Sequence, residues 1–134
     1  MNILFVCKHN RFRSKVAELI FRKLNINNRN EAKSAGVQLD FLRPYVEENV
    51  KRILEKRGYN VNNELPRQIN EFDLKWAYKI VIVANNVSPD LFKEFKREIE
   101  VWDIGDCDTS DKKMIEEIIK KIEEKVKGLV DNLR

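Results

Sequence analysis

Short runs of apolar residues recur along the chain, and between them the apolar positions have helical spacing. Four short segments are candidate strands. The first has the composition of a strand that is buried on both faces, whereas the second and fourth mix apolar with polar residues. The third is the most strand-like, because every residue after its first lysine is apolar. The pattern therefore predicts four strands, at residues 2–6, 32–35, 79–84 and 99–102.

The stretches after the first two runs predict helices. Ser14 is a candidate N-cap for a helix that continues to about Leu24 and ends in an Asn-rich loop at residues 25–30. Pro44 is expected to open a second helix, and Gly58 lies where a glycine often ends one. Both helices carry an apolar stripe, so each can cover one face of a sheet.

The second half of the chain continues the alternation. Residues 66–74 predict a short helical or irregular segment, and Ser88 with Pro89 predicts the start of another helix. Asp111 is a candidate cap for a long closing helix. Strands that alternate with helices favour an α/β fold, here a three-layer structure with a four-stranded parallel sheet and helices on both faces. We expect a single domain over residues 1–134.

Composition and charge narrow the functional classes. Two cysteines and one histidine exclude a disulfide-dense scaffold, a four-cysteine zinc site and a His-rich metal site. The net charge is +4, but 22 acidic residues are interspersed with 26 basic ones, which favours a mixed-charge surface over a nucleic-acid face. No apolar run approaches the ~20 residues of a membrane span, and the N-terminus lacks a basic signal region. We expect a soluble cytoplasmic monomer that binds neither nucleic acid nor membrane.

Cys7 lies where the first strand runs into the first helix, in the sequence Cys-Lys-His-Asn-Arg-Phe-Arg-Ser. Backbone N–H groups at a helix N-terminus, together with cationic side chains, favour a nucleophilic thiolate there. The same N–H groups form a nest for a phosphate-like oxyanion. Arg13 can hold two oxygens of the anion, and Ser14 can donate its hydroxyl to the sulfur. With no metal ligands nearby, this segment indicates phosphoryl transfer to cysteine.

The segment resembles the signature of the low-molecular-weight protein tyrosine phosphatases, a Cys-x5-Arg-Ser sequence just after the first strand. The resemblance extends along nearly the whole chain, through Ser34-Ala35-Gly36 and the strand at residues 79–84 to the Trp-Asp-Ile-Gly-Asp sequence at residues 102–106. It implies the family's α/β fold and a metal-independent phosphomonoester hydrolase without a cofactor. The implied substrate is a phosphotyrosine protein or another aryl phosphate, and the implied intermediate is a cysteinyl phosphate.

The same resemblance assigns roles to the loop. It makes Cys7 the nucleophile, Arg13 the phosphate clamp and Ser14 the support of the thiolate. Asn10 matches an asparagine that holds the loop by hydrogen bonds, and it also tolerates left-handed backbone. His9 is expected to line the loop and not to act as a base. The loop's backbone N–H groups are expected to bind the phosphate: those of Lys8, His9, Asn10, Arg11, Phe12, Arg13 and Ser14.

A phosphate ester needs a proton on its leaving oxygen, and the family supplies it from an aspartate that normally precedes a proline. The alignment puts Asp106 on this acid, with Cys107 in place of the proline. This departure leaves the loop less rigid, so that Asp103 and Asp108 remain candidates. A reversible disulfide between the two cysteines also stays open.

Phe41 and Tyr45 lie in the region of the family's variable substrate-recognition loop. They are candidates for a rim that stacks on the substrate's ring, although Phe41 could equally cover the core.

Three other functions stay open beside the phosphatase. Arsenate reductases of this fold carry two further cysteines after the third strand, where residues 85–89 here have none. A phosphocysteine carrier would share the sheet and the cysteine loop, but Arg13 followed by Ser14 favours hydrolysis. A non-catalytic phosphate-binding module would not need a reactive Cys7.

Overall fold

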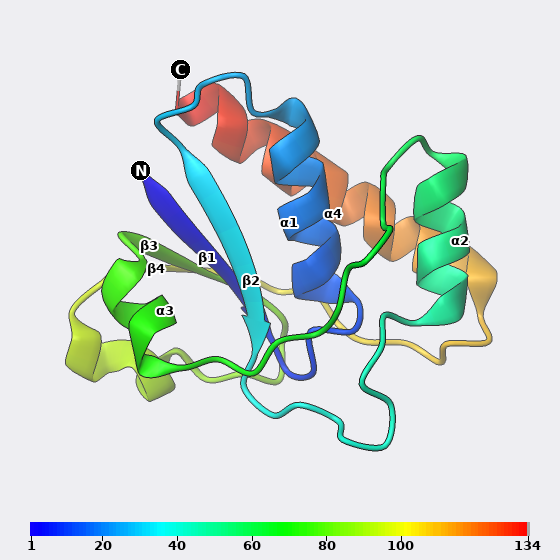
Figure 1. Cartoon of the computed structure of the whole chain (residues 1–134), viewed down its shortest axis with the longest axis horizontal. Helices are drawn as coiled ribbons and strands as arrows, with labels where there is room; N and C mark the ends of the chain where they lie inside the picture. Colours follow the sequence, from blue (N-terminus) through cyan, green and yellow to red (C-terminus); the bar gives the residue numbers. More distant parts are fainter. Residues whose placement is uncertain (134) are drawn as a thin grey trace.

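The sheet predicted from the sequence is present and all of its strands run parallel (Figure 1). The computed structural model describes residues 1–133. Along the sheet the strand order is β2-β1-β3-β4. Each strand lies within about two residues of its predicted position, and the bounds are β1 (Asn2–Cys7), β2 (Glu31–Gly36), β3 (Lys79–Val83) and β4 (Glu98–Trp102).

Helices cover both faces of the sheet, as predicted (Figure 1). Side chains that alternate along the strands divide between two hydrophobic clusters, so that Ile3 and Phe5 face one layer while Leu4 and Val6 face the other. One layer holds α1 (Arg13–Leu24), α2 (Glu48–Lys56) and α4 (Lys112–Asn132). The other layer holds α3 (Glu71–Trp76) and the 3-10 helix η1 (Pro89–Phe95).

The centre of β1 is buried on both faces, which explains its continuous apolar sequence. The four residues from Ile3 to Val6 are all fully buried. On the α1 side, the ring of Phe5 lies 6.0 Å from that of Phe21 and 5.8 Å from that of Trp102. Burial of such side chains contributes roughly 1.5–3 kcal/mol each, so the strand that carries Cys7 is firmly anchored.

Two predicted helix starts are wrong. The helix α1 begins at Arg13 with Phe12 at its N-cap position, because the hydroxyl of Ser14 is directed to Cys7 instead of to a backbone N–H. The helix α2 begins at Glu48 and not at Pro44. The chain before it is held away from helical geometry, since the backbone N–H of Glu47 donates to the carbonyl of Arg11 at 3.1 Å.

The other predicted helix ends are confirmed. Asp111 caps α4 by accepting a hydrogen bond from the N–H of Met114 at 3.1 Å, and Ser88 caps η1 in the same way through Asp90. Gly58 follows α2 with a φ of +87°, a left-handed conformation that glycine adopts without strain.

The strand order places a topological switch point beside β1. The chain leaves β1 toward β2 on one side, and β3 pairs with β1 on the other. In such sheets the crevice beyond the carboxyl ends of the strands is the usual ligand site. Cys7 is the last residue of β1 and therefore opens into this crevice.

Candidate active site

Three hydrogen-bonding groups converge on the sulfur of Cys7, which is buried at the end of β1. The Oγ of Ser14 lies 2.9 Å from the sulfur, and the backbone N–H groups of Asn10 and Ser14 donate to it at 3.3 and 3.4 Å. These three contacts fix the position of the sulfur at the end of β1.

Asn10 makes hydrogen bonds both within the loop and to two other segments. Its φ is +57°, and its side chain is fully buried. The Nδ2 group donates to the Oγ of Ser14 at 2.7 Å and to the Oγ of Ser34 at 3.0 Å, while Oδ1 accepts from the backbone N–H of Arg67 at 2.9 Å. One asparagine thus connects the loop to β2 and to the segment before α3.

The end of β2 lies directly against the loop. A Cβ atom on Gly36 would lie 2.8 Å from the backbone of His9 and of Lys8, closer than real Cβ contacts come. Beyond this glycine, the N–H of Val37 donates to the carbonyl of Cys7 at 3.1 Å, and that of Gln38 donates to Lys8 at 2.8 Å. The absence of a side chain at Gly36 therefore allows the loop to pack on the sheet.

Arg13 is held in position by groups from two other strand ends. Its Nη1 donates to the carbonyl of Ile104 at 2.9 Å, and its Nη2 donates to the Oδ1 of Asn86 at 3.2 Å. A guanidinium has five N–H donors. These two hydrogen bonds therefore fix the orientation of the Arg13 guanidinium and leave its other N–H donors available to bind an anion. The sequence analysis did not identify Asn86 as a site residue. Its place just after β3, at the carboxyl edge of the sheet, could have indicated this role.

Arg11 and His9 support the loop from its outer side. The Nε of Arg11 donates to the carbonyl of Tyr45 at 2.9 Å, and its Nη2 pairs with Glu47 at 3.2 Å. The Nδ1 of His9 lies 2.6 Å from the carbonyl of Gln38, which can only accept a hydrogen bond, so Nδ1 carries the hydrogen. The side chain of Arg11 is therefore directed to the segment before α2 and not to the cysteine.

A cavity of about 280 Å³ opens above the loop. Its lining brings together most of the predicted loop residues with Asp106 and Asp108. The lining also includes Arg43 and Glu47, which the sequence pattern did not indicate. Lys8 is not among its lining residues. The lining consists of Cys7, His9, Asn10, Arg11, Phe12, Arg13, Arg43, Glu47, Asp106, Cys107, Asp108 and Thr109.

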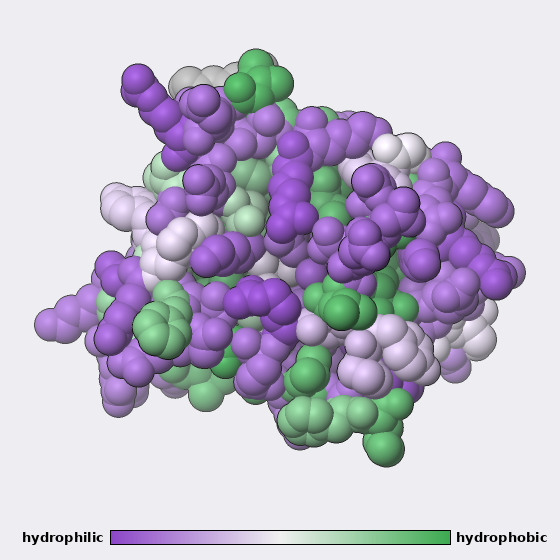
Figure 2. All heavy atoms as spheres, viewed as in Figure 1, coloured by the Kyte–Doolittle hydropathy of each residue, from purple (hydrophilic) through white to green (hydrophobic). Residues whose placement is uncertain are grey.

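The predicted aromatic rim is not part of this lining. Phe41 is 83% exposed, so the interpretation that it covers the core is wrong, and it does not line the cavity. Tyr45 is half exposed, with its ring 5.1 Å from the guanidinium of Arg11. In Figure 2, hydrophobic atoms gather at the lower edge of this face, over the segment between β2 and α2, where Leu42 is also exposed.

The three candidate acids differ in position. Asp103 lies outside the cavity and lines a separate hollow with Lys121 and Glu124. Asp108 lines the cavity, but the backbone N–H and the hydroxyl of Ser110 both donate to it and hold its pKa below the usual range. Asp106 lines the cavity with only its Oδ1 engaged, by the N–H of the next residue at 2.9 Å.

Cys107 is the second thiol of the cavity. Its partial burial raises its pKa, and the neighbouring carboxylates of Asp106, Asp111 and Asp108 raise it further. Cys107 is therefore a neutral thiol near pH 7, in contrast to the donor-rich surroundings of Cys7.

Comparison with known families gives a match along the chain. The family described as "Low molecular weight phosphotyrosine protein phosphatase" matches residues 2–134. The chain belongs to this family.

The individual proteins that this chain resembles are named for different activities. It is 34% identical over 92 residues to the low molecular weight protein-tyrosine-phosphatase YfkJ of Bacillus subtilis, in an alignment that spans 65% of this chain and 59% of that protein. It is 32% identical to a crystal structure named as an arsenate reductase from Archaeoglobus fulgidus, with a TM-score of 0.75 over 96% of this chain and 98% of that one. The YwlE arginine phosphatase of Geobacillus stearothermophilus has the same fold, with a TM-score of 0.86 at 21% identity, covering 98% of this chain and 92% of that one.

Two further features of this family member concern metals and membranes. Across residues 1–133, no three side chains of the His, Cys, Asp or Glu type are grouped so as to hold a metal ion. Over the same residues, none of the helices has the length and apolar character needed to cross a bilayer.

Proposed function

We propose that this family member is a cysteine-dependent phosphatase that hydrolyses phosphotyrosine in proteins, or small aryl phosphates, without a metal ion. The observation that carries the proposal is the placement of the Cys7 sulfur, which lines the same cavity as Arg13, accepts hydrogen bonds from two backbone N–H groups and lies 2.9 Å from the Oγ of Ser14. A stabilised sulfur anion beneath an oxyanion site is the arrangement needed for attack on phosphorus.

The reaction has two steps. In the first, the thiolate of Cys7 forms a bond to phosphorus while the bond to the ester oxygen breaks, and Asp106 gives its proton to the departing oxygen. In the second, water attacks the cysteinyl phosphate, Asp106 takes a proton from this water, and the sulfur leaves as a thiolate with inorganic phosphate as the product.

Arg13 and the loop N–H groups bind the transferred group throughout. Negative charge is spread over the three equatorial oxygens of the transferring phosphoryl group, and fixed donors stabilise it most in the transition state. The hydrogen bonds from Arg13 to Ile104 and Asn86 hold the guanidinium before the substrate arrives, so little reorganisation is needed.

Among the carboxylates, Asp106 is the proposed acid because of its place and its partners. It lines the cavity, whereas Asp103 does not. Asp108 also lines the cavity, but the two hydrogen bonds that its Oδ1 accepts from Ser110 lower its pKa and make it the poorer proton donor.

The test is release of nitrophenol from p-nitrophenyl phosphate by the purified protein in the presence of EDTA. We expect turnover in EDTA, loss of turnover in Cys7→Ser, and retained binding of inorganic phosphate by that variant, because Arg13 and the backbone donors survive. No release of nitrophenol by the folded wild-type chain contradicts the phosphatase proposal. Release by Cys7→Ser at a comparable rate contradicts the covalent mechanism.

Arsenate reduction is the second candidate, and the 32% identity to a protein named as an arsenate reductase favours it. That reaction needs two electrons, which two thiols supply as they form a disulfide. Residues 85–89 contain no cysteine, but Cys107 lines the same cavity as Cys7. Arsenite formation in the presence of a dithiol reductant, lost in Cys107→Ser, would favour this activity, whereas a lack of arsenite formation excludes it.

A further inference from the structure

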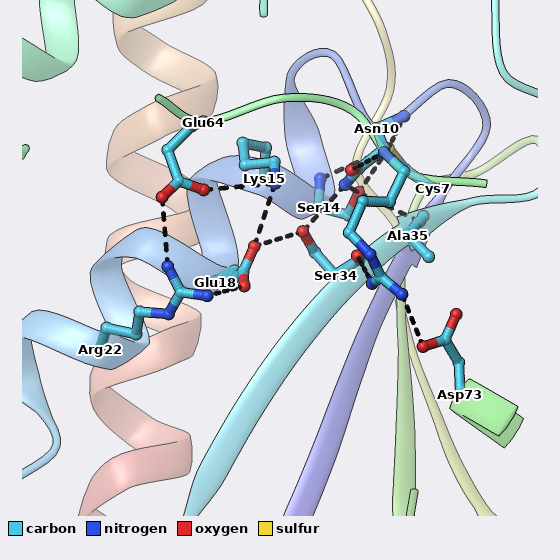
Figure 3. A network of polar contacts seen from close by, with 11 residues as sticks. Cys7, Asn10, Ser14, Lys15, Glu18, Arg22, Ser34, Ala35, Glu64 and Asp73 are labelled. Carbon is cyan, nitrogen blue, oxygen red and sulfur yellow. Dashed lines mark hydrogen bonds and ion pairs between the residues drawn. The ribbon is translucent and has the colours of Figure 1, made fainter. Parts of the chain in front are cut away.

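Two loops line the cavity, and they are held to the rest of the fold in different ways. The β1–α1 loop (residues 8–12) is bound at several points. Asn10 connects it to the Oγ of Ser34 in β2 at 3.0 Å (Figure 3) and to the backbone N–H of Arg67 at 2.9 Å. The carbonyl of Lys8 also accepts a hydrogen bond from the segment after β2. The loop that follows the cysteine is therefore firmly placed.

The β4–α4 loop (residues 103–111), which carries Asp106, is fixed at its two ends. Near its start, the carbonyl of the buried Ile104 accepts a hydrogen bond from Arg13 at 2.9 Å. At its end, the side chain of Asp111 caps α4. The proposed acid lies in the stretch between these two points.

One hydrogen bond connects the middle of this loop to the rest of the protein. The Nδ2 of Asn49, in the first turn of α2, donates to the carbonyl of Thr109 at 2.7 Å. A carbonyl oxygen only accepts, so the group of Asn49 that faces it is the NH2. The other hydrogen bonds of residues 105–110 stay within the β4–α4 loop. Among residues 1–133, Asn49 alone is hydrogen-bonded to this stretch from outside the loop.

The start of α2 is a firm support for this contact. Val50, the next residue, is fully buried in the core. Glu47 binds the β1–α1 loop, because its backbone N–H donates to the carbonyl of Arg11 at 3.1 Å and its carboxylate pairs with the Arg11 guanidinium at 3.2 Å. Figure 1 shows the β4–α4 loop passing the same end of the helix. Glu47 and Asn49 thus connect the two loops of the cavity through one helix end.

We propose that Asn49 is a positioning residue for Asp106, and that it acts by holding the β4–α4 loop in place relative to Cys7. The proposal rests on the proposed function to the extent that Asp106 protonates the leaving oxygen. Proton transfer needs donor and acceptor within hydrogen-bond reach. A loop that has lost its only outside contact in this stretch places the acid correctly for a smaller part of the time, which slows the step that needs the proton.

Cys107 provides a probe of the loop that needs no substrate. It directly follows Asp106, is partly buried and packs against the core. In a Cys7→Ser background it is the only thiol. We expect Asn49→Ala to raise the rate of Cys107 alkylation by iodoacetamide, at one fixed pH, by about three- to tenfold, the effect of one lost hydrogen bond on local opening. An unchanged rate overturns the proposal.

A second measurement, with Cys7 intact, shows whether the contact acts through the acid. Phosphotyrosine has the poorer leaving group, so its hydrolysis depends more on a proton donor than that of p-nitrophenyl phosphate. We expect Asn49→Ala to lower kcat/KM by about tenfold for phosphotyrosine and by less than about threefold for p-nitrophenyl phosphate. Equal losses for the two substrates overturn the proposal.

The double variant gives the sharper form of this test. In an Asp106→Asn background the positioned group has no proton to give, so Asn49→Ala should cause no further loss with phosphotyrosine. A general loss of structure would lower the rate in either background. A further tenfold loss in the double variant therefore overturns the proposal.

Asn25→Ala is the matched control. The Nδ2 of Asn25 also donates to a backbone carbonyl, that of Asn30 at 2.9 Å, and neither residue lines the cavity. The variant removes the same kind of hydrogen bond, so it should cost a similar amount of stability. We expect it to leave the alkylation rate of Cys107 and the ratio of kcat/KM for the two substrates as in the parent. Changes equal to those of Asn49→Ala overturn the proposal.

The alkylation result and the phosphatase assay fail separately. If Asn49→Ala speeds alkylation but the wild-type chain hydrolyses no aryl phosphate, the proposed function fails and the role of Asp106 with it, while Asn49 still holds the loop. If the wild-type chain hydrolyses both substrates and Asn49→Ala keeps their ratio of kcat/KM, the proposed function stands and Asn49 has no positioning role.

Discussion

The contact between Gly36 and the loop that follows Cys7 allows one substitution to be worked out in detail. An alanine Cβ at this position would lie 2.8 Å from the carbonyl carbon of His9, 2.8 Å from the carbonyl oxygen of Lys8 and 2.9 Å from the backbone nitrogen of Asn10. Non-bonded carbon atoms are comfortable at about 3.5–4.0 Å. The atoms in contact are backbone, so no side chain can rotate away, and the loop must move by about 0.7 Å relative to β2.

This displacement acts on the groups that surround the sulfur. The backbone N–H of Asn10 donates to Cys7, and this nitrogen is one of the three atoms that the new methyl group would push. A misplacement of about 1 Å at a reacting centre costs on the order of 100-fold in rate, so we expect Gly36→Ala to lower kcat/KM by roughly 10- to 50-fold. Overpacking of this kind also costs about 1–3 kcal/mol of unfolding free energy.

The assay compares kcat/KM for p-nitrophenyl phosphate and the urea midpoint of unfolding with those of Gly128→Ala. Gly128 lies inside α4, and an added Cβ there meets nothing within 4 Å. That control should keep its kcat/KM and gain up to about 1 kcal/mol of stability from the helix propensity of alanine. Wild-type stability and kcat/KM in Gly36→Ala would refute the reasoning, because they would mean that the loop is not packed on the end of β2.

Three further substitutions test roles in the cavity, and a fourth tests a pH effect outside it. Arg13→Lys should lower kcat/KM for p-nitrophenyl phosphate by about 100-fold or more, since an ammonium group cannot replace a fork that binds two oxygens; near-normal kinetics would contradict the clamp. Asp106→Asn should slow hydrolysis of phosphotyrosine by about 10²–10⁴-fold and that of p-nitrophenyl phosphate by less, whereas Asp108→Asn should have the smaller effect on both. Partial burial, with the nearby Glu123 carboxylate, raises the pKa of Tyr59 to about 12, so the folded state prefers the neutral phenol. The stabilisation from this phenol should be complete below pH 10 and be lost as the pH rises toward 12, and urea unfolding of Tyr59→Phe should show a weaker fall in this window.

Local sequence features predicted most of the fold. Continuous apolar runs located β1 and β3, because the central strands of a parallel sheet are covered on both faces. The edge strands β2 and β4 mix apolar with polar residues, and their shorter patterns were still sufficient to locate them. Asp111, Ser88 and Gly58 marked element ends because caps and left-handed residues act over three or four neighbouring residues. Cys7 ends β1 and Arg13 begins α1, so the predicted passage from strand to helix is present at this segment, whose pattern is also a local feature.

The predictions that failed involve contacts between distant parts of the chain. Ser14 was a reasonable N-cap by its type, but its hydroxyl is engaged by the sulfur seven residues earlier. The start of α2 was misplaced because residue 47 is bound to Arg11, 36 residues away in sequence. Asn86 lies 73 residues from the guanidinium that it orients, so only the assembled sheet reveals the contact.

The choice of asparagine at position 10 follows from the same long-range contacts. The loop from Cys7 to Ser14 contains no glycine, yet it needs left-handed backbone at one residue, where φ is +57°. Glycine would supply this conformation most cheaply, but it would leave Ser14, Ser34 and the N–H of Arg67 without the buried partner that the amide provides. Asparagine tolerates the conformation and satisfies all three groups. Because each of those groups belongs to a different segment, the one residue that sets the curvature of the loop also sets its position against the sheet, and with it the position of Ser14 beside the sulfur of Cys7.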